Sequence, residues 1–111
     1  MIESTVDSIL RVAASQPDNR TAATAIKPLI ATLRRTLETT RFQGPPRIVT
    51  YQPPTVRAGE SHAMTAERVA HRLNDLHCAR ELGTPEDVRA VIDMTVNEVR
   101  TAAMGRQGVA T

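Results

Sequence analysis

Three residues with metal-binding side chains are spaced so that they share one face of a helix. His71, Asp75 and Cys78 follow one another at intervals of four and three positions, and residues at such intervals are neighbours on a helix surface. A structural zinc ion takes about four ligands. A single helix supplies too few of them, and no CxxC or HxxxH partner motif occurs elsewhere in the sequence. We therefore expect no metal and no other cofactor here.

Cys78 also stands beside a histidine, which raises the question of nucleophilic catalysis. His77 and Cys78 are adjacent in the sequence, and adjacent side chains on a helix point about 100° apart, so they cannot pair directly. No GxSxG, P-loop or GxGxxG motif is present. The sequence predicts a non-enzymatic protein with no small-molecule substrate, in which His77 lies on the core side, hydrogen-bonded to a neighbour.

The segment ARELGTPEDV, residues 79–88, has the Ala-x-x-x-Gly spacing of a helix-turn-helix turn. The apolar Val88 comes one position too soon after Gly83 for that motif, and Ala79 lies off the apolar stripe of its helix. Because of these two departures, we do not assign the chain to a helix-turn-helix family. A small dimeric DNA-binding transcriptional regulator that uses the helices on either side of this turn is kept as the alternative function.

Basic residues are concentrated in one part of the chain, although the net charge is only +2. From Arg20 to Arg57 there are seven basic residues and one acidic residue, whereas from Ala58 onward there are six basic and eight acidic residues. Arginine makes bidentate contacts with phosphate, and a row of such residues binds a nucleic-acid backbone without reading its sequence. An ordinary solvated surface is the competing interpretation. The candidate nucleic-acid-binding residues are Arg20, Lys27, Arg34, Arg35, Arg41, Arg47 and Arg57.

Apolar residues at helical spacing predict four helices, over about 4–15, 19–40, 65–82 and 85–103. The segment 42–62 contains four prolines within Pro45–Pro54 and predicts an extended connection, either a linker or a strap across a partner. Residues 105–111 are expected to fray. The predicted fold is a single all-α domain, a small bundle of two helical hairpins joined by the Pro-rich segment.

Residues at the expected helix ends support these boundaries. Asp18 is an expected N-cap, and Ser4 or Thr5 is expected to cap the first helix. Thr84 with Pro85 gives the clearest start in the chain.

Two further expectations concern helix interiors. Pro28 falls opposite the apolar stripe of 19–40, which favours one kinked helix over a fresh start near Lys27. In the helix over 65–82, His71 and Cys78 are expected to point toward water. The expected core face of that helix is Val69, Ala70, Leu73 and Leu76.

Composition gives a general setting for the chain. Aromatic residues make up 2% of it, one Phe and one Tyr, so the core must rest on aliphatic side chains and alanine. The single cysteine, the lack of a signal-peptide pattern and the lack of a long apolar run lead us to expect a cytoplasmic protein without a membrane span. Thirteen arginines against one lysine favour a bacterial or phage source.

Together these features predict a helical adaptor or structural subunit of a larger assembly. The assembly could be a nucleoprotein complex in which the basic face contacts DNA or RNA. A protein partner or self-association through the second or fourth helix is expected.

Overall fold

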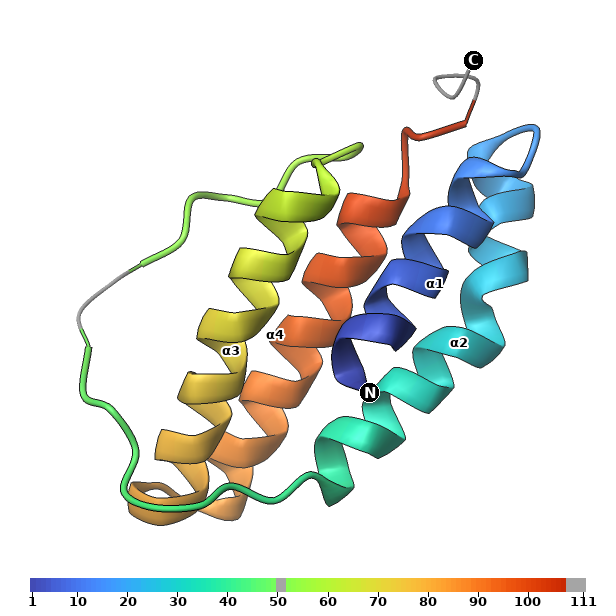
Figure 1. The fold of residues 1–111 in the computed structure, drawn as a ribbon. Coiled ribbons are helices and arrows are strands. Elements are labelled where there is room, and N and C mark those ends of the chain that lie inside the picture. Colours follow the sequence, from blue (N-terminus) through green and yellow to red (C-terminus); the bar gives the residue numbers. More distant parts are fainter. Residues whose placement is uncertain (50–51, 108–111) are drawn as a thin grey trace.

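The computed structural model describes residues 1–49 and 52–107, and within these it contains four helices and no strand. The helices are α1 (Ile2–Ala14), α2 (Asn19–Thr39), α3 (His62–Leu82) and α4 (Pro85–Ala103) (Figure 1). The all-α bundle of two helical hairpins predicted from the sequence is confirmed.

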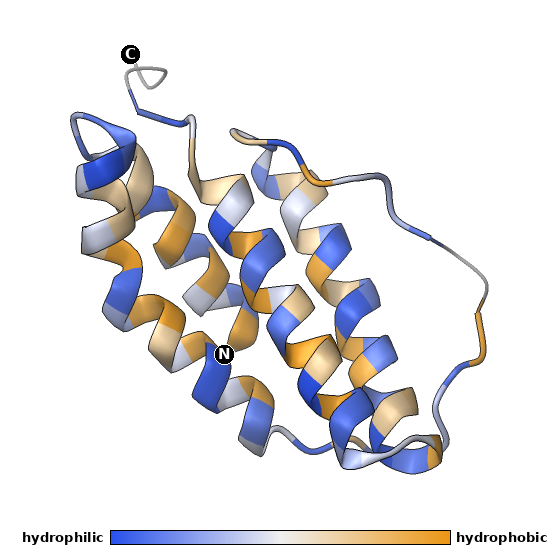
Figure 2. Ribbon diagram, turned by 180° about the vertical axis from the view of Figure 1, so that it is seen from behind, coloured by the Kyte–Doolittle hydropathy of each residue, from blue (hydrophilic) through white to orange (hydrophobic). Residues whose placement is uncertain are grey.

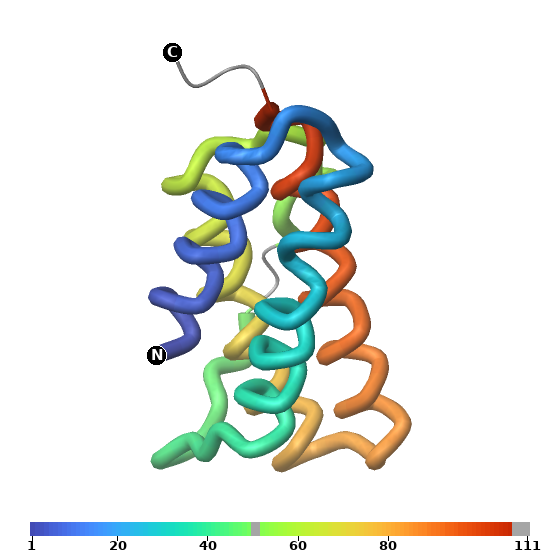
Figure 3. Tube along the Cα trace, turned by 90° about the vertical axis from the view of Figure 1, so that its right-hand side faces the viewer, coloured from blue at the N-terminus to red at the C-terminus, as the bar shows by residue number. Residues whose placement is uncertain are grey.

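The four helices form two layers of two. α1 packs on α2 and α3 packs on α4, and the two hairpins lie side by side through the pairs α2–α4 and α1–α3. α4 also reaches α1 across the diagonal. Figures 1 and 3 show the result: α1 and α3 form one layer and α2 and α4 form the other. The bundle therefore has two broad faces on opposite sides.

The core lies mainly between α1, α2 and α4. Apolar and polar residues alternate along all four helices (Figure 2), and α3 adds only Val69 and Leu76 to the main apolar cluster. Ala70, which we expected on the core face of its helix, is exposed, because α3 turns Arg68 and Arg72 inward. The apolar residues of α4 that belong to this cluster are Ile92, Val96, Val99, Ala102 and Ala103, and all five are buried. The largest fully buried apolar side chains are Ile9, Leu10, Ile26, Leu33, Leu37, Leu76, Val96 and Val99.

Two of the expected helix caps are present. The Asp18 carboxylate accepts the N–H of Thr21 at 2.7 Å. At the start of α4, the Thr84 hydroxyl accepts the N–H of Asp87 at 3.2 Å, and the Asp87 carboxylate accepts the N–H of Thr84 at 2.8 Å. This reciprocal capping box, with Pro85 in the first turn, fixes where α4 begins.

The expected cap of α1 is wrong. The hydroxyls of Ser4 and Thr5 donate to the carbonyl of Met1 and accept no backbone N–H. α1 begins earlier because Ile2 is already buried in the core. α3 likewise begins three residues before the expected start, at His62, because the Ser61 hydroxyl accepts the N–H of Met64 at 3.1 Å.

α2 runs without interruption through Pro28, which is exposed on the outer side of the helix. Proline lacks an N–H, so one helical hydrogen bond is missing at this point. The missing bond faces water, where it is least costly. This agrees with the expectation of one helix rather than two.

The connection between α2 and α3 lies against α3 itself. The Asn74 side chain accepts the N–H of Arg47 at 3.3 Å and donates to its carbonyl at 2.8 Å. The Phe42 ring stacks on His77 with centroids 4.7 Å apart, and His77 Nε2 donates to the carbonyl of Gly44 at 3.1 Å. His77 is thus buried and hydrogen-bonded, as expected. Thr50 and Tyr51 lie outside the described residues.

The beginning of the tail also makes contacts with the bundle. The N–H of Gly105 donates to the Asn19 side chain at 2.8 Å, and the Gln107 amide donates to the carbonyl of Ala13 at 2.8 Å. Residues 105–107 therefore contact the two helices on either side of the α1–α2 turn. We had expected residues 105–111 to fray. Residues 108–111 lie outside the described part of the chain.

Within the described ranges, none of the helices has both the length and the apolar character that crossing a bilayer requires.

Candidate nucleic-acid interface

Three of the seven predicted basic residues form a row along α2. Arg20, Lys27 and Arg34 follow one another at intervals of seven positions, which is close to two helical turns and keeps them on one side of the helix. Arg20 and Lys27 are exposed, and Arg34 is half-buried. The row lies on the side of α2 that faces α4, because Arg34 reaches a side chain of that helix.

An ion pair connects this row to α4. Arg34 Nη1 lies 2.6 Å from Asp93 Oδ1. On α4, Arg89 precedes Asp93 by four positions and Arg100 follows it by seven, so both belong to the same side of that helix. Both side chains are exposed. The outer face of the α2–α4 layer therefore carries basic residues from two helices.

Acidic residues reduce the charge of this face without reversing it. Asp93 is paired with Arg34. Glu38 lies at one end of the row, where it lines the same cavity as Arg89. Glu86 is the remaining carboxylate on this side of α4, in its first turn. Against three carboxylates stand five basic groups, Arg20, Lys27, Arg34, Arg89 and Arg100. The face keeps a net positive charge.

The other four predicted residues lie elsewhere. Arg35 is exposed on α2 but points away from the row, since it is one position beyond Arg34. Arg41, Arg47 and Arg57 are exposed on the connection, whose backbone at Arg47 is held to Asn74 of α3. The sequence grouped all seven in one segment, and the fold brings only Arg20, Lys27 and Arg34 into one row.

The cavity at the end of the row has a volume of about 440 Å³ and lies between α2 and the α3–α4 turn. Three arginines line it, Arg34, Arg80 and Arg89. Arg80 is already engaged: its guanidinium donates to the carbonyls of Leu37 at 2.6 Å and Glu38 at 3.0 Å, and to that of Thr40. These are carbonyls at the end of α2, so Arg80 satisfies the C-terminus of that helix.

The side chains considered for a metal have structural partners. Asp75 pairs with Arg72 at 3.0 Å. The Cys78 thiol donates to the carbonyl of Arg47 at 3.5 Å, and Cys78 is half-buried beside the connection where we expected it to point toward water. Among residues 1–49 and 52–107 there is no group of three or more His, Cys, Asp or Glu side chains placed to hold a metal ion.

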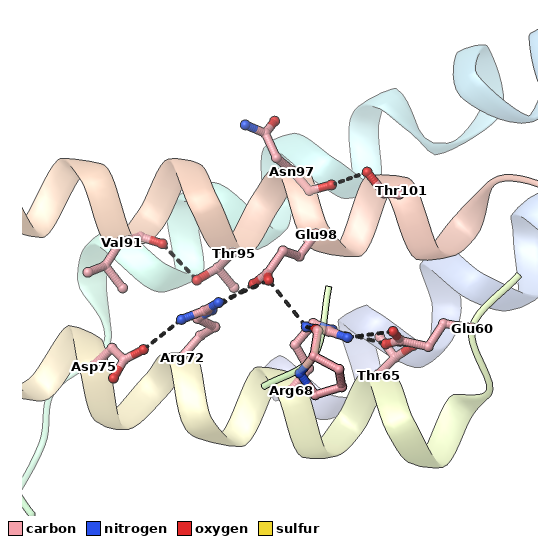
Figure 4. A network of polar contacts seen from close by, with 11 residues as sticks. Glu60, Thr65, Arg68, Arg72, Asp75, Val91, Thr95, Asn97, Glu98 and Thr101 are labelled. Atoms are coloured by element: carbon pink, nitrogen blue, oxygen red, sulfur yellow. Dashed lines mark hydrogen bonds and ion pairs between the residues drawn. The ribbon is translucent and has the colours of Figure 1, made fainter. Parts of the chain in front are cut away.

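Sequence reasoning missed a buried ionic network that joins α3 to α4 and to the connection (Figure 4). Arg68 makes a bidentate pair with Glu60, at 3.1 and 2.7 Å. Arg72 makes a bidentate pair with Glu98, at 2.7 and 3.0 Å. Arg68 also donates to Glu98 at 3.3 Å and to the carbonyl of Pro54 at 2.6 Å. One guanidinium thus holds three separate segments together.

The network is deeply buried and its pKa values reflect its pairing. The side chains of Arg68 and Glu60 are 2% and 7% exposed. Burial alone would raise the pKa of the Glu60 carboxyl, but the hydrogen bonds and charge of Arg68, with the Thr65 hydroxyl, outweigh it and hold that pKa below its usual value. The pKa of Arg68 is raised, and the largest cause is its hydrogen bonds to Glu60. The pKa of Arg72 is also raised, and the largest cause is its hydrogen bonds to Glu98. Glu60, Arg68 and Arg72 are therefore charged at neutral pH.

A signal for this network was present in the sequence. Thr65, Arg68 and Arg72 occupy the same side of α3 as Val69 and Leu76. Two arginines within the buried side of a helix require carboxylate partners. The sequence did not indicate which carboxylates these were, because Glu60 precedes α3 and Glu98 lies on another helix.

The geometry thus gives two kinds of charged site: a buried network that joins α3, α4 and the connection, and a basic face on the α2–α4 layer. Comparison of the chain with protein-family models, with curated proteins and with solved structures gives no match.

Proposed function

We propose that this protein is a non-enzymatic helical adaptor subunit of a nucleoprotein assembly, and that its α2–α4 face contacts the phosphate backbone of a nucleic acid. The observation that carries the proposal is the row of Arg20, Lys27 and Arg34 along α2, continued by Arg89 and Arg100 on α4. Five basic groups on one face present a positively charged surface to a polyanion.

The chemistry of this face favours the backbone over the bases. Stacking platforms for unpaired bases use exposed aromatic rings. Phe42 is half-buried and stacked on His77, in the connection and away from the row. Guanidinium and ammonium groups instead suit phosphate oxygens. We infer binding that depends on charge and not on sequence.

The adaptor role draws support from how the polar side chains are used. The histidine beside the only cysteine donates to a backbone carbonyl, and the thiol does the same. The carboxylates of Glu60 and Glu98 are engaged by arginines. These four side chains are engaged in structural contacts, whereas the basic face is exposed.

The test is a salt series with labelled duplex DNA and RNA, followed by fluorescence anisotropy. With about five phosphate contacts, the logarithm of the affinity should fall against the logarithm of the salt concentration with a slope of about −4. The double charge reversal Lys27→Glu with Arg100→Glu should reduce this slope by about 2.

The matched control is Arg35→Glu with Arg57→Glu, which changes the net charge equally at exposed positions outside the row. It should retain most of the slope. If both double variants lose affinity to the same extent, binding does not use the α2–α4 face. If the wild-type protein binds neither nucleic acid at low salt, the proposal is wrong.

The alternative, a dimeric DNA-binding regulator, finds no comparable support. Helix-turn-helix pairs cross at about 90–120°, whereas α3 and α4 are long helices that pack along one another as an antiparallel hairpin (Figure 1). A regulator would prefer its own site over random DNA by orders of magnitude. Competition with unrelated duplex DNA in the same assay distinguishes the two.

A further inference from the structure

The ion pair on the basic face, Arg34 with Asp93, is built differently from the pairs of the buried network. It joins one donor, Nη1, to one acceptor, Oδ1, at 2.6 Å, and the two side chains are 39% and 49% exposed. Arg68 and Arg72 instead each hold a carboxylate through two hydrogen bonds, and their side chains are 2% and 16% exposed. The pair on the basic face is therefore open to water and depends on a single contact.

This pair lies next to cations that have no carboxylate partner. α2 and α4 run in opposite directions (Figure 1), so Lys27, seven positions before Arg34, and Arg100, seven after Asp93, reach the same level of the bundle. That level is about 10 Å from the pair along the helix axes. Arg20 lies one further interval along α2. Among the described residues, none of these three cations is ion-paired.

Asp93 takes the position on Arg34 that a phosphate oxygen would take. Carboxylate and phosphate oxygens are alternative acceptors for the same guanidinium, and both can bind it through two parallel hydrogen bonds. Asp93 engages only one nitrogen of Arg34, which leaves other donors for a phosphate. Exposed ion pairs of this kind contribute little to stability. Exchange of the carboxylate for a phosphate therefore leaves the bundle intact.

We propose that Asp93 is a built-in competitor of the nucleic acid: it holds Arg34 in the free protein, and a backbone phosphate displaces it on binding. The proposal rests on the proposed nucleic-acid function and adds an autoinhibitory contact to the same face. Displacement leaves the Asp93 carboxylate unpaired beside a polyanion, which is unfavourable. Asp93 therefore lowers the affinity of the face.

The neighbouring cations decide which anion can displace Asp93. A polyanion that contacts Arg20, Lys27 and Arg100 brings its next phosphates close to Arg34, so their effective concentration there is high. A free phosphate ion has no such anchorage and meets the Arg34 carboxylate partner at its bulk concentration. The pair should therefore open to nucleic acid and stay closed to inorganic phosphate.

The first test compares the affinities of three single variants for labelled duplex DNA at low salt. Asp93→Asn keeps the shape of the side chain and removes its charge. Glu38→Gln is the matched control on the same face, at an exposed carboxylate that makes no ion pair within the described part of the chain. Glu67→Gln makes the same change at an exposed position of α3.

Asp93→Asn should raise the affinity several-fold, and clearly more than either control does. Its salt slope should stay within one contact of the wild-type slope, about 0.9, because the same phosphates are bound in both proteins. The urea midpoint of the variant should stay close to that of the wild type, which shows that the gain does not come from a changed fold.

The second test observes the Arg34 side chain directly, through the Nε–H resonance of isotopically labelled protein, assigned with Arg34→Lys. Saturation of the wild type with duplex should move this resonance toward its position in the Asp93→Asn complex. Inorganic phosphate, at the same concentration of phosphate groups, should leave it in place.

Each contrary result has a separate meaning. An Arg34 resonance that does not move in protein saturated with duplex overturns the proposal and leaves the nucleic-acid function standing. The same holds if Asp93→Asn raises affinity no more than Glu38→Gln, or if inorganic phosphate alone opens the pair. If neither the wild type nor Asp93→Asn binds nucleic acid, the proposed function fails and this inference fails with it.

Discussion

The two interfaces made by α4 differ in their chemistry. Toward the main core, α4 contributes Val96, Val99 and Ala103, which are fully buried with no polar partner to satisfy. Toward α3, it contributes Glu98, which binds the guanidinium groups of Arg68 and Arg72. The first interface depends on how well side chains fill space, and the second on whether each charge meets its counterpart.

This difference shows how α3 is held. Apolar burial is not directional, so it joins α1, α2 and α4 without fixing each contact individually. A buried ion pair is weak evidence for net stability, because desolvation offsets much of the attraction. Its geometry is strict, however, and Arg68 binds Glu60, Glu98 and the Pro54 carbonyl together. The network positions α3 and the connection relative to α4.

Removal of one charge from the network should have the largest effect. Glu98→Ala deprives Arg72 of its bidentate partner and leaves it with Asp75, whereas Arg68 keeps Glu60 and the Pro54 carbonyl. Because a largely buried guanidinium loses its main carboxylate partner, we expect a loss of about 3 kcal/mol in the free energy of unfolding, measured by urea denaturation. Glu67→Ala, at an exposed carboxylate, should change it by less than about 0.5 kcal/mol. A similar small loss in both variants would mean that the network contributes little.

A cavity in the apolar interface should have a comparable effect. Leu33 is fully buried between helices, and Leu33→Ala should cost about 3 kcal/mol by lost burial and the cavity left behind. Leu82 is 68% exposed, and Leu82→Ala should be close to neutral. If Leu33→Ala were as mild as Leu82→Ala, the core would be able to collapse around the deletion.

Acid should affect the polar interface first. The pKa of Glu60 is lower in the folded state than in the unfolded chain, so its stabilising contribution is present above about pH 4.3 and is lost as the pH falls below that value. The urea midpoint of the wild-type protein should decrease in this range. Glu60→Gln should show a shallower decrease. An identical pH profile in the two proteins would assign the acid sensitivity to other carboxylates.

The smallest effect should come from the turn that sets α3 beside α4. Thr84→Ala removes the hydroxyl that accepts the N–H of Asp87, and a lost N-cap costs about 1 kcal/mol. Thr24→Ala, at an exposed position within α2, serves as the control and should be neutral or slightly stabilising, since alanine favours a helix. Thermal unfolding followed by circular dichroism can resolve the two. Equal effects would show that the cap is dispensable.

The sequence alone determined the helical class of the fold and indicated where several helices begin. Apolar residues at helical spacing indicated the four helices, because their burial requires one face per helix. Asp18 and Thr84 indicated helix starts because a side-chain oxygen before a helix satisfies its first N–H groups.

Tertiary structure alone decided which charges meet. Helical spacing puts Arg68 and Arg72 on the same side of α3 as Val69 and Leu76, but it does not identify their partners Glu60 and Glu98, which lie outside α3. Arg34 and Asp93, which join α2 to α4, are 59 positions apart. Periodicity reports the direction in which a side chain leaves its own helix. The packing of the helices decides which side chain of another helix it then contacts. Local spacing in the sequence does not predict that packing.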